Sequence, residues 1–309
     1  MENINECTIV AGNLNDKNYL FKNRDKMYMS EYKIVHELFE GVEIVITSDS
    51  TGWAEGMNEY GIGFVYSFLA KPSDLKKNIP NIMQSYSETS DSKTYKEKIN
   101  DFKKILSFKK LDDAVKWCEK KKWNGNYFIA DKNNVYELEI YGNQIFKKFI
   151  KKDELMSRKY VVKTNISDNI IAGHQNQSNR NENYVSAYFR KYNTEQKLIG
   201  VKNYFDILKR MSHNIFEPES VLNQFRRDES ELTISQFLME LEDKIFIYLN
   251  MEDSRLYQGI QNVLPKSYTP KIKLIVYDIS DFNDNQMEWK RFKTMSKNLY
   301  QYWKDISIE

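Results

Sequence analysis

The first seventy residues contain a series of short runs rich in β-branched and aromatic residues, separated by clusters of Asn, Asp, Gly and Ser. These runs are CTIVAG, NYLFKN, VEIVITS and GIGFVYSFL. Runs of this length and composition predict strands, and NLNDKN after the first run supplies a hairpin loop. The beginning of the chain therefore predicts an antiparallel sheet.

The pattern changes between Ser92 and Trp123. KTYKEKINDFKKILSF and KLDDAVKWCEKKKW place apolar residues three and four positions apart between lysines and acids. This spacing is typical of amphipathic helices, and Cys118 falls on the apolar stripe of the second one. We therefore expect two consecutive helices and a buried Cys118.

Strand patterns resume with NYFIADKNNVYELEIYGNQIFKKFI, in which DKNN marks a tight turn, and with RKYVVKT before Asn165. A helical pattern follows from Asn183 to His213. ELTISQFLMELEDKIFIYLN then predicts a hairpin around Glu242 and Asp243, KIKLIVYD a strand, and the stretch near 285–306 an amphipathic helix. Because no linker rich in Pro, Gly or Ser interrupts the chain, we expect one α+β domain.

Composition excludes several functional classes. The chain has 309 residues, with 46 basic and 44 acidic residues spread along its length and a formal charge of +2, which argues against a nucleic-acid or anionic-membrane surface. Without a long apolar run or a secretory signal pattern, we expect a cytoplasmic protein. Two cysteines exclude a disulfide framework, and three histidines without paired spacing predict no metal site.

Cys7 lies near the beginning of the chain, at the head of an apolar run. A thiol becomes a nucleophile when its pKa is lowered or when a base takes its proton, and His174 could in principle be that base. Cleavage before Cys7 would free an α-amine with an ordinary pKa of about 7.7 to 8.0, so one residue would supply nucleophile and base. The plain alternative is a structural cysteine in the core.

The residues after Cys7 favour the catalytic interpretation. An apolar strand, a short hairpin and KNRD follow, and Asp25 stands eighteen positions after the cysteine. This opening resembles that of the N-terminal nucleophile (Ntn) hydrolases. In particular it is similar to the group of choloylglycine hydrolases, penicillin V acylases, acid ceramidase-like proteins and isopenicillin N acyltransferases. In that group an Asn-X-Asp step follows two strands, and its aspartate holds the α-amine.

Further stretches resemble motifs of the same group in the same order, between about Cys7 and Asn250. They are EGMNEYGIGFV, the hairpin NYFIADKNNVYELE, the strand end KYVVKTN, the segment AGHQ, the helix start SAYFR and the late hairpin TISQFLMELEDKIFIYLN. These stretches place Glu139, Asn165, Gln175, Ser186 and Arg190.

The resemblance implies roles that physical chemistry also supports. Cys7 would be the nucleophile, and Asp25 would accept a hydrogen bond from its α-ammonium group. Asn165 would point its amide NH₂ at the developing oxyanion, and Arg190 would pair with Asp25 or with the cysteine region. The plain alternatives are an exposed turn acid, a turn-capping asparagine and a solvated arginine.

The substrate-facing residues implied by the resemblance are Arg24, Asn58, Ser67 and His174. Some relatives have an arginine three positions before the aspartate, where this chain has Lys22. Many relatives also have Asn-His where this chain has Asn165-Ile166, and an asparagine near Ser67. These departures leave open which cation, Lys22, Arg24 or Arg190, lines the site.

As a whole, the resemblance implies a four-layer αββα sandwich with two stacked antiparallel sheets. Residues 1–6 would be a leader removed on maturation, and residues 7–309 would form a single Ntn-hydrolase domain. The implied activity is hydrolysis of a linear N-acyl amide through an acyl-Cys7 intermediate, without a cofactor.

Two alternatives stay open at this point. The acyl group could be transferred to an amine, or a non-catalytic relative could serve as a binding module. Many relatives form homo-oligomers, which keeps a homodimer or tetramer open for this chain, and no nucleic-acid or membrane partner is expected.

Overall fold

The structure is a computed structural model, and it describes residues 7–26, 33–48, 54–69, 93–170, 182–211, 232–252 and 271–278. Within these residues the strands form two sheets, of six and seven strands, in which the neighbours pair antiparallel. The six-stranded sheet contains, in spatial order, β10 (Tyr160–Lys163), β1 (Cys7–Leu14), β2 (Lys17–Lys26), β11 (Leu232–Glu240), β12 (Ile245–Glu252) and β13 (Lys271–Asp278). The seven-stranded sheet follows chain order through β3 (Lys33–Phe39), β4 (Val42–Ser48), β5 (Ala54–Asn58), β6 (Gly63–Ser67), β7 (Gly125–Ala130), β8 (Asn134–Tyr141) and β9 (Gln144–Lys151).

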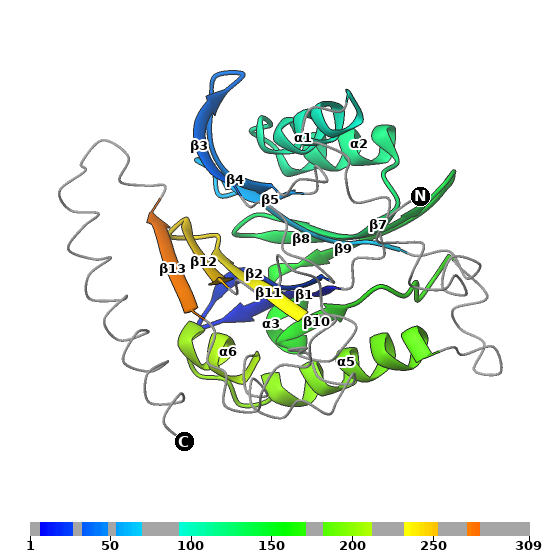
Figure 1. Ribbon diagram of the computed structural model, residues 1–309, viewed down its shortest axis with the longest axis vertical. Coiled ribbons are helices and arrows are strands. Elements are labelled where there is room, and N and C mark those ends of the chain that lie inside the picture. Colours follow the sequence, from blue (N-terminus) through cyan, green and yellow to red (C-terminus); the bar gives the residue numbers. More distant parts are fainter. Residues whose placement is uncertain are drawn as a thin grey trace.

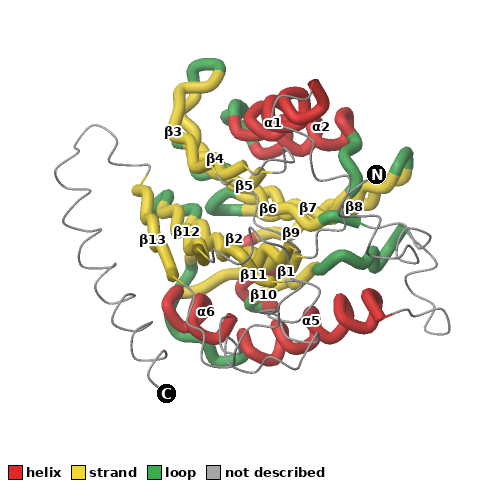
Figure 2. The backbone as a smooth tube through the Cα atoms, viewed as in Figure 1, coloured by secondary structure: helices red, strands yellow, loops and turns green. Residues whose placement is uncertain are grey.

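Helices cover the outer face of each sheet (Figure 1). α1 (Lys93–Leu106) and α2 (Leu111–Lys121) pack on the seven-stranded sheet, and α5 (Glu182–Leu198) and α6 (Tyr204–Met211) pack on the six-stranded sheet. The short α3 (Lys152–Arg158) contacts β1, β9 and β10. The fold is therefore an αββα sandwich, as expected, and Figure 2 shows the two strand layers between the helices.

Strand alternation divides the core into three layers. Ile9 and Ala11 of β1 point between the two sheets, whereas Val10 points to the opposite face, where Leu208 of α6 covers it. Apolar residues of β4 and β6 pack in the same way under α1 and α2, where Cys118 is buried as predicted. Successive side chains of a strand point to opposite faces, so each central strand contributes to two layers.

The layer between the sheets becomes polar at one end. Beyond the apolar positions, alternate inward-facing residues of seven strands are polar or carry a thiol, and all are buried: Cys7, Lys22, Arg24, Glu55, Ser67, Asn126, Glu137, Glu139 and Lys163. Burial of so many polar groups is tolerated only when they bind one another. The polar end of the inter-sheet layer is therefore where chemistry can take place.

Three elements were not predicted from the sequence: β3, β5 and α3. β3 is an edge strand whose side chains at 34–39 are half-buried or exposed, and the apolar residues of its run KIVHELF stand in two pairs, which gives no alternation of period two. α3 contains one buried residue, Leu155, and is too short to establish a helical period. The expected helix near 285–306 lies outside the described residues.

No helix in the described ranges is long and apolar enough to cross a membrane.

Candidate active site around Cys7

Cys7 is the first residue of β1, and its side chain is buried within the polar end of the inter-sheet layer. Its backbone N–H donates to Asn165 Oδ1 at 2.7 Å, and its carbonyl oxygen accepts from Arg190 Nη1 at 3.0 Å. The backbone pairing of β1 with β2 sets Cys7 opposite Arg24. Both polar backbone groups of the candidate nucleophile are thus held by side chains from distant parts of the chain.

Asn165 is held in place by the opposite sheet. It follows β10, and its Nδ2 donates to the carbonyl oxygen of Phe68 at 2.9 Å. The carbonyl oxygen of the preceding Thr164 accepts from Ser67 Oγ at 2.7 Å and from Asn126 Nδ2 at 2.6 Å. A residue that binds the cysteine of one sheet is therefore fixed by hydrogen bonds from the other sheet.

Arg190 and Asp25 form a buried ion pair beside the cysteine. Arg190 of α5 and Asp25 of β2 are both 0% exposed, and Arg190 Nη1 lies 3.7 Å from Asp25 Oδ2. Arg190 Nη2 also donates to Asn165 Oδ1 at 3.2 Å, and Asp25 Oδ1 accepts from Thr233 Oγ1 at 2.6 Å. The guanidinium group connects Asp25, Asn165 and the backbone of Cys7, which suits its fork of donors.

A second buried ionic group lies on the inward face. Lys22 and Arg24, both on β2, form salt bridges with one carboxylate, that of Glu55 on β5. The three side chains are at most 2% exposed and carry two positive charges and one negative charge. Sequence reasoning missed Glu55, although two basic residues at alternate positions of a strand that otherwise points apolar residues inward require a buried counter-ion.

These charges act on the Cys7 thiol in opposite directions. Burial raises the pKa of the thiol above its ordinary value, Lys22 and Arg24 lower it, and Asp25 and Glu55 add to the increase. The net result is a raised pKa. The thiol is therefore protonated at neutral pH, and a base must take its proton before it can attack a carbonyl.

Of the residues predicted to be catalytic, the structure brings together Cys7, Asp25, Asn165 and Arg190. The amide of Asn165 is oriented differently from the prediction, because its oxygen faces Cys7 and its NH₂ faces Phe68. An amide NH₂ has two hydrogens, so a contact with an oxyanion would use the hydrogen that does not point at the Phe68 carbonyl.

Asn58, which was predicted to face the substrate, has an amide that binds four backbone groups. Its Nδ2 donates to the carbonyl oxygens of Leu106 and Phe108 at 2.8 and 2.9 Å, and its Oδ1 accepts from the N–H groups of Tyr60 and Ile62 at 3.0 and 2.9 Å. Backbone groups therefore use both donors and both lone-pair directions of this amide. Asn58 holds the turn after β5 and the end of α1.

The other predicted substrate-facing residues differ in position. Arg24 lies beside the cysteine with its charge directed to Glu55. Ser67 is buried and donates to Thr164, so it ties the two sheets together. His174 lies outside the described residues, as does Gln175. Among the described residues no group of three or more His, Cys, Asp and Glu side chains is arranged to hold a metal ion.

Fold and site together define an αββα sandwich in which a buried cysteine begins a strand at the polar end of the inter-sheet layer. No family model and no curated protein matches the sequence. Among solved structures the chain is similar to penicillin V acylase from Agrobacterium tumefaciens, with a TM-score of 0.48, 12% identity, and coverage of 89% of this chain and 86% of that one.

Two variants of the conjugated bile acid hydrolase from Clostridium perfringens are also similar. One is a mutant with a TM-score of 0.39 and 13% identity, covering 89% of this chain and 98% of that chain. The other variant has a TM-score of 0.39 and 12% identity, covering 91% of this chain and 100% of that chain. Penicillin V acylases are also among the proteins whose motifs the sequence resembles.

Proposed function

We propose that this protein is an Ntn amidohydrolase that cleaves a linear N-acyl amide through a thioester on Cys7, after removal of residues 1–6. The observation that carries the proposal is the arrangement around the backbone nitrogen of Cys7. That nitrogen donates to Asn165 Oδ1, and Arg190 connects the same oxygen to Asp25. A purely structural cysteine has no need of buried charges around its backbone nitrogen, because burial of such charges is costly.

Maturation would use the same groups. Cys7 Sγ attacks the carbonyl carbon of Glu6, the C–N bond breaks, and the thiol proton ends on the nitrogen of Cys7. Water then hydrolyses the thioester, which releases the leader MENINE with a carboxyl terminus and restores the thiol. The freed amine keeps Asn165 Oδ1 as an acceptor, and Asp25 supplies the nearby negative charge that favours its ammonium form.

In turnover the α-amine of Cys7 would act as the base that the buried thiol requires. Its ordinary pKa of about 7.7 to 8.0 is close to neutral, so it can take a proton and return it. The thiolate attacks the carbonyl carbon of the substrate amide, and the ammonium group gives its proton to the leaving amine. Water then hydrolyses the acyl-Cys7 thioester, and the acid product leaves.

The charges on the inward face fit this sequence of events. Lys22, Arg24 and Glu55 together carry one positive charge in excess, and both cations act to lower the pKa of the thiol. Negative charge that forms on the sulfur or on the oxyanion would therefore be stabilised in a site of low dielectric constant.

Intact mass and active-site labelling test the proposal. Purified protein should lose the mass of residues 1–6, and an electrophilic amide or β-lactam probe should modify Cys7 stoichiometrically and leave Cys118 unmodified. Labelling should be lost in Asp25→Asn and absent in Cys7→Ala. An active protein that stays uncut before Cys7 would overturn the maturation step, and labelling no better at Cys7 than at Cys118 would favour a binding module.

Turnover of N-acyl amides distinguishes hydrolysis from acyl transfer. A panel of N-acyl amides is incubated with the processed protein, with and without added amines, and Cys7→Ala is the blank. Release of free acid that is unaffected by amines supports the hydrolase. Diversion of the acyl group to the amine would assign the protein to the acyltransferases.

A further inference from the structure

Glu139 lies near the end of β8 and is 0% exposed, yet its carboxylate is the centre of a hydrogen-bond cluster. Its Oε1 accepts from Lys163 Nζ at 2.6 Å, from Asn169 Nδ2 at 2.6 Å and from the backbone N–H of Asp168 at 3.2 Å. Its Oε2 accepts from Ser167 Oγ at 2.7 Å and from the backbone N–H of Asn169 at 3.0 Å. Four of these five donors come from the segment directly after Asn165.

This cluster requires an ionised carboxylate. Burial acts against the charged form of Glu139, but Lys163 and the hydrogen bonds from Ser167 and Asn169 hold its pKa below the ordinary value. Both oxygens act only as acceptors, which an ionised carboxylate can satisfy and an amide cannot. The segment 167–169 is therefore folded around a fixed negative charge.

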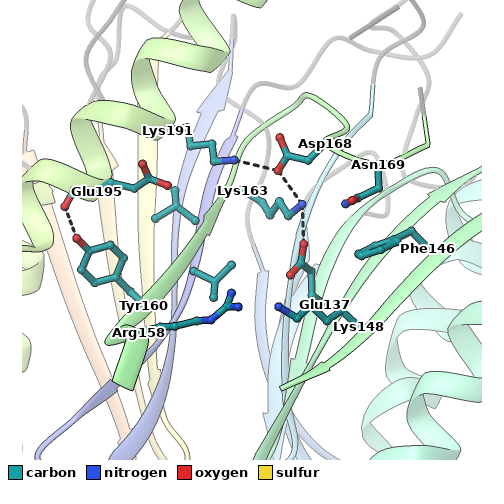
Figure 3. A pocket seen from close by; sticks show the side chains of 12 residues that line it. Glu137, Phe146, Lys148, Arg158, Tyr160, Lys163, Asp168, Asn169, Lys191 and Glu195 are labelled. Atoms are coloured by element: carbon teal, nitrogen blue, oxygen red, sulfur yellow. Dashed lines mark hydrogen bonds and ion pairs between the residues drawn. The ribbon is translucent and has the colours of Figure 1, made fainter. Parts of the chain in front are cut away.

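The cluster extends to the helix that carries Arg190. Asp168 Oδ2 accepts from Lys163 Nζ at 2.8 Å and from Lys191 Nζ at 2.9 Å. Lys191 is the neighbour of Arg190 on α5. Figure 3 shows Lys191, Asp168, Lys163 and Glu137 joined in one line of ionic contacts along a cleft of about 450 Å³.

The two residues that hold the backbone of Cys7 are therefore attached to the same ionic cluster. Asn165 precedes the segment that Glu139 binds, and Arg190 precedes the lysine that Asp168 binds. We propose that Glu139 is a positioning residue that fixes residues 164–170, and through them Asn165 and Arg190, against Cys7. Its catalytic consequence rests on the proposed function.

Glu139→Gln tests this inference, and Glu137→Gln is the matched control. Glu137 faces the same side of β8 two residues earlier and binds the same Lys163, at 2.7 Å, without a hydrogen bond to the segment. Both substitutions keep the size of the side chain and remove one charge. In Glu139→Gln the new NH₂ group faces N–H and O–H donors and cannot accept their hydrogen bonds. In Glu137→Gln the substitution affects only the contact with Lys163.

The first readout is hydrogen exchange of the Asp168 and Asn169 amides, measured on the full chain. Exchange at both should be at least about tenfold faster in Glu139→Gln, which corresponds to about 1.4 kcal/mol, and within about twofold of wild type in Glu137→Gln. Equal acceleration in both variants would overturn the inference, because it would show that the charge of the cluster matters and the carboxylate of Glu139 does not.

The second readout is kcat for an N-acyl amide that the wild type cleaves. The rate is divided by the amount of Cys7 that reacts with the electrophilic probe, so that misfolded molecules do not count. In Glu139→Gln this kcat should fall at least about tenfold, with KM within about twofold, because transition-state contacts are lost and substrate binding is kept. An unchanged kcat together with faster exchange would overturn the positioning role. Should Glu139→Gln not fold, Asn169→Ala removes one donor and should show the same pattern to a smaller extent.

Absence of turnover in the wild type would overturn the proposed function alone. The exchange rates of Asp168 and Asn169 would still support or overturn the anchoring by Glu139, because they do not depend on catalysis.

Discussion

The buried carboxylate of Glu55 offers a quantitative test of how the polar end of the inter-sheet layer is stabilised. Glu55→Gln keeps the shape of the side chain and removes the only charge opposite to Lys22 and Arg24 in this group. All three side chains are at most 2% exposed, so water cannot replace the lost partner. Removal of one partner from a buried ion pair costs about 3–5 kcal/mol, and we expect a loss of unfolding free energy in this range.

Glu40→Gln is the control for this experiment. Glu40 pairs with Lys104 on the surface, where the two side chains are 47% and 28% exposed, and such pairs contribute at most about 1 kcal/mol. Unfolding in urea, followed by tryptophan fluorescence at neutral pH and extrapolated linearly to water, gives both values. A loss below about 1 kcal/mol for Glu55→Gln, equal to that of Glu40→Gln, would refute the argument.

The same variant makes a prediction of known sign for the nucleophile. Glu55 is one of the groups that raise the pKa of the Cys7 thiol, whereas Lys22 and Arg24 lower it. Without the Glu55 carboxylate one of the influences that raise the pKa of the thiol is lost, whereas Lys22 and Arg24 still lower it, so alkylation of Cys7 by iodoacetamide should move to lower pH than in wild type. A shift to higher pH would contradict the charge balance described for the site.

Three further outcomes are expected. The pKa of Glu139 is lowered in the folded state, so the carboxylate stabilises the fold fully above its unfolded-state pKa of about 4.3, and this stabilisation is lost as pH falls through the folded-state pKa. The difference in urea midpoint between wild type and Glu139→Gln should therefore narrow below about pH 4. Arg190→Met removes the cation 3.7 Å from buried Asp25 and should lower the free energy of unfolding in urea by about 3–5 kcal/mol. The variant should also lose labelling of Cys7, and a stable variant that is still labelled would contradict this role. Gly56→Ala places a Cβ 2.4 Å from the carbonyl oxygen of Val45 and should lower stability by about 1–3 kcal/mol, measured by thermal unfolding.

The sequence predicts those parts of the fold that local patterns determine. A run rich in β-branched residues identified β1, the strand patterns on either side of a tight turn identified β7 and β8, and the helical period identified α1 and α2 with Cys118 on the buried stripe. β5 has only five residues and contains a glycine whose missing side chain admits Leu106 from α1, so its strand character depends on tertiary packing.

The candidate site was predictable only where motifs carry it. The order of motifs indicated Asp25, Asn165 and Arg190, which lie together around Cys7. Glu55 was not predictable in this way, because it becomes the partner of Lys22 only when two separate sheets stack. For Asn58 the motif gives the identity of the residue and does not give the four backbone groups that its amide binds.

The hydrogen bonds from Ser67 and Asn126 to the carbonyl oxygen of Thr164 have a consequence for when the chain can mature. They join the segment that carries Asn165 to the seven-stranded sheet, whereas the cysteine that Asn165 binds belongs to the six-stranded sheet. A newly made chain whose sheets have not yet docked lacks this arrangement. Under the proposed mechanism such a chain retains its leader, so cleavage before Cys7 takes place only after the two sheets have docked.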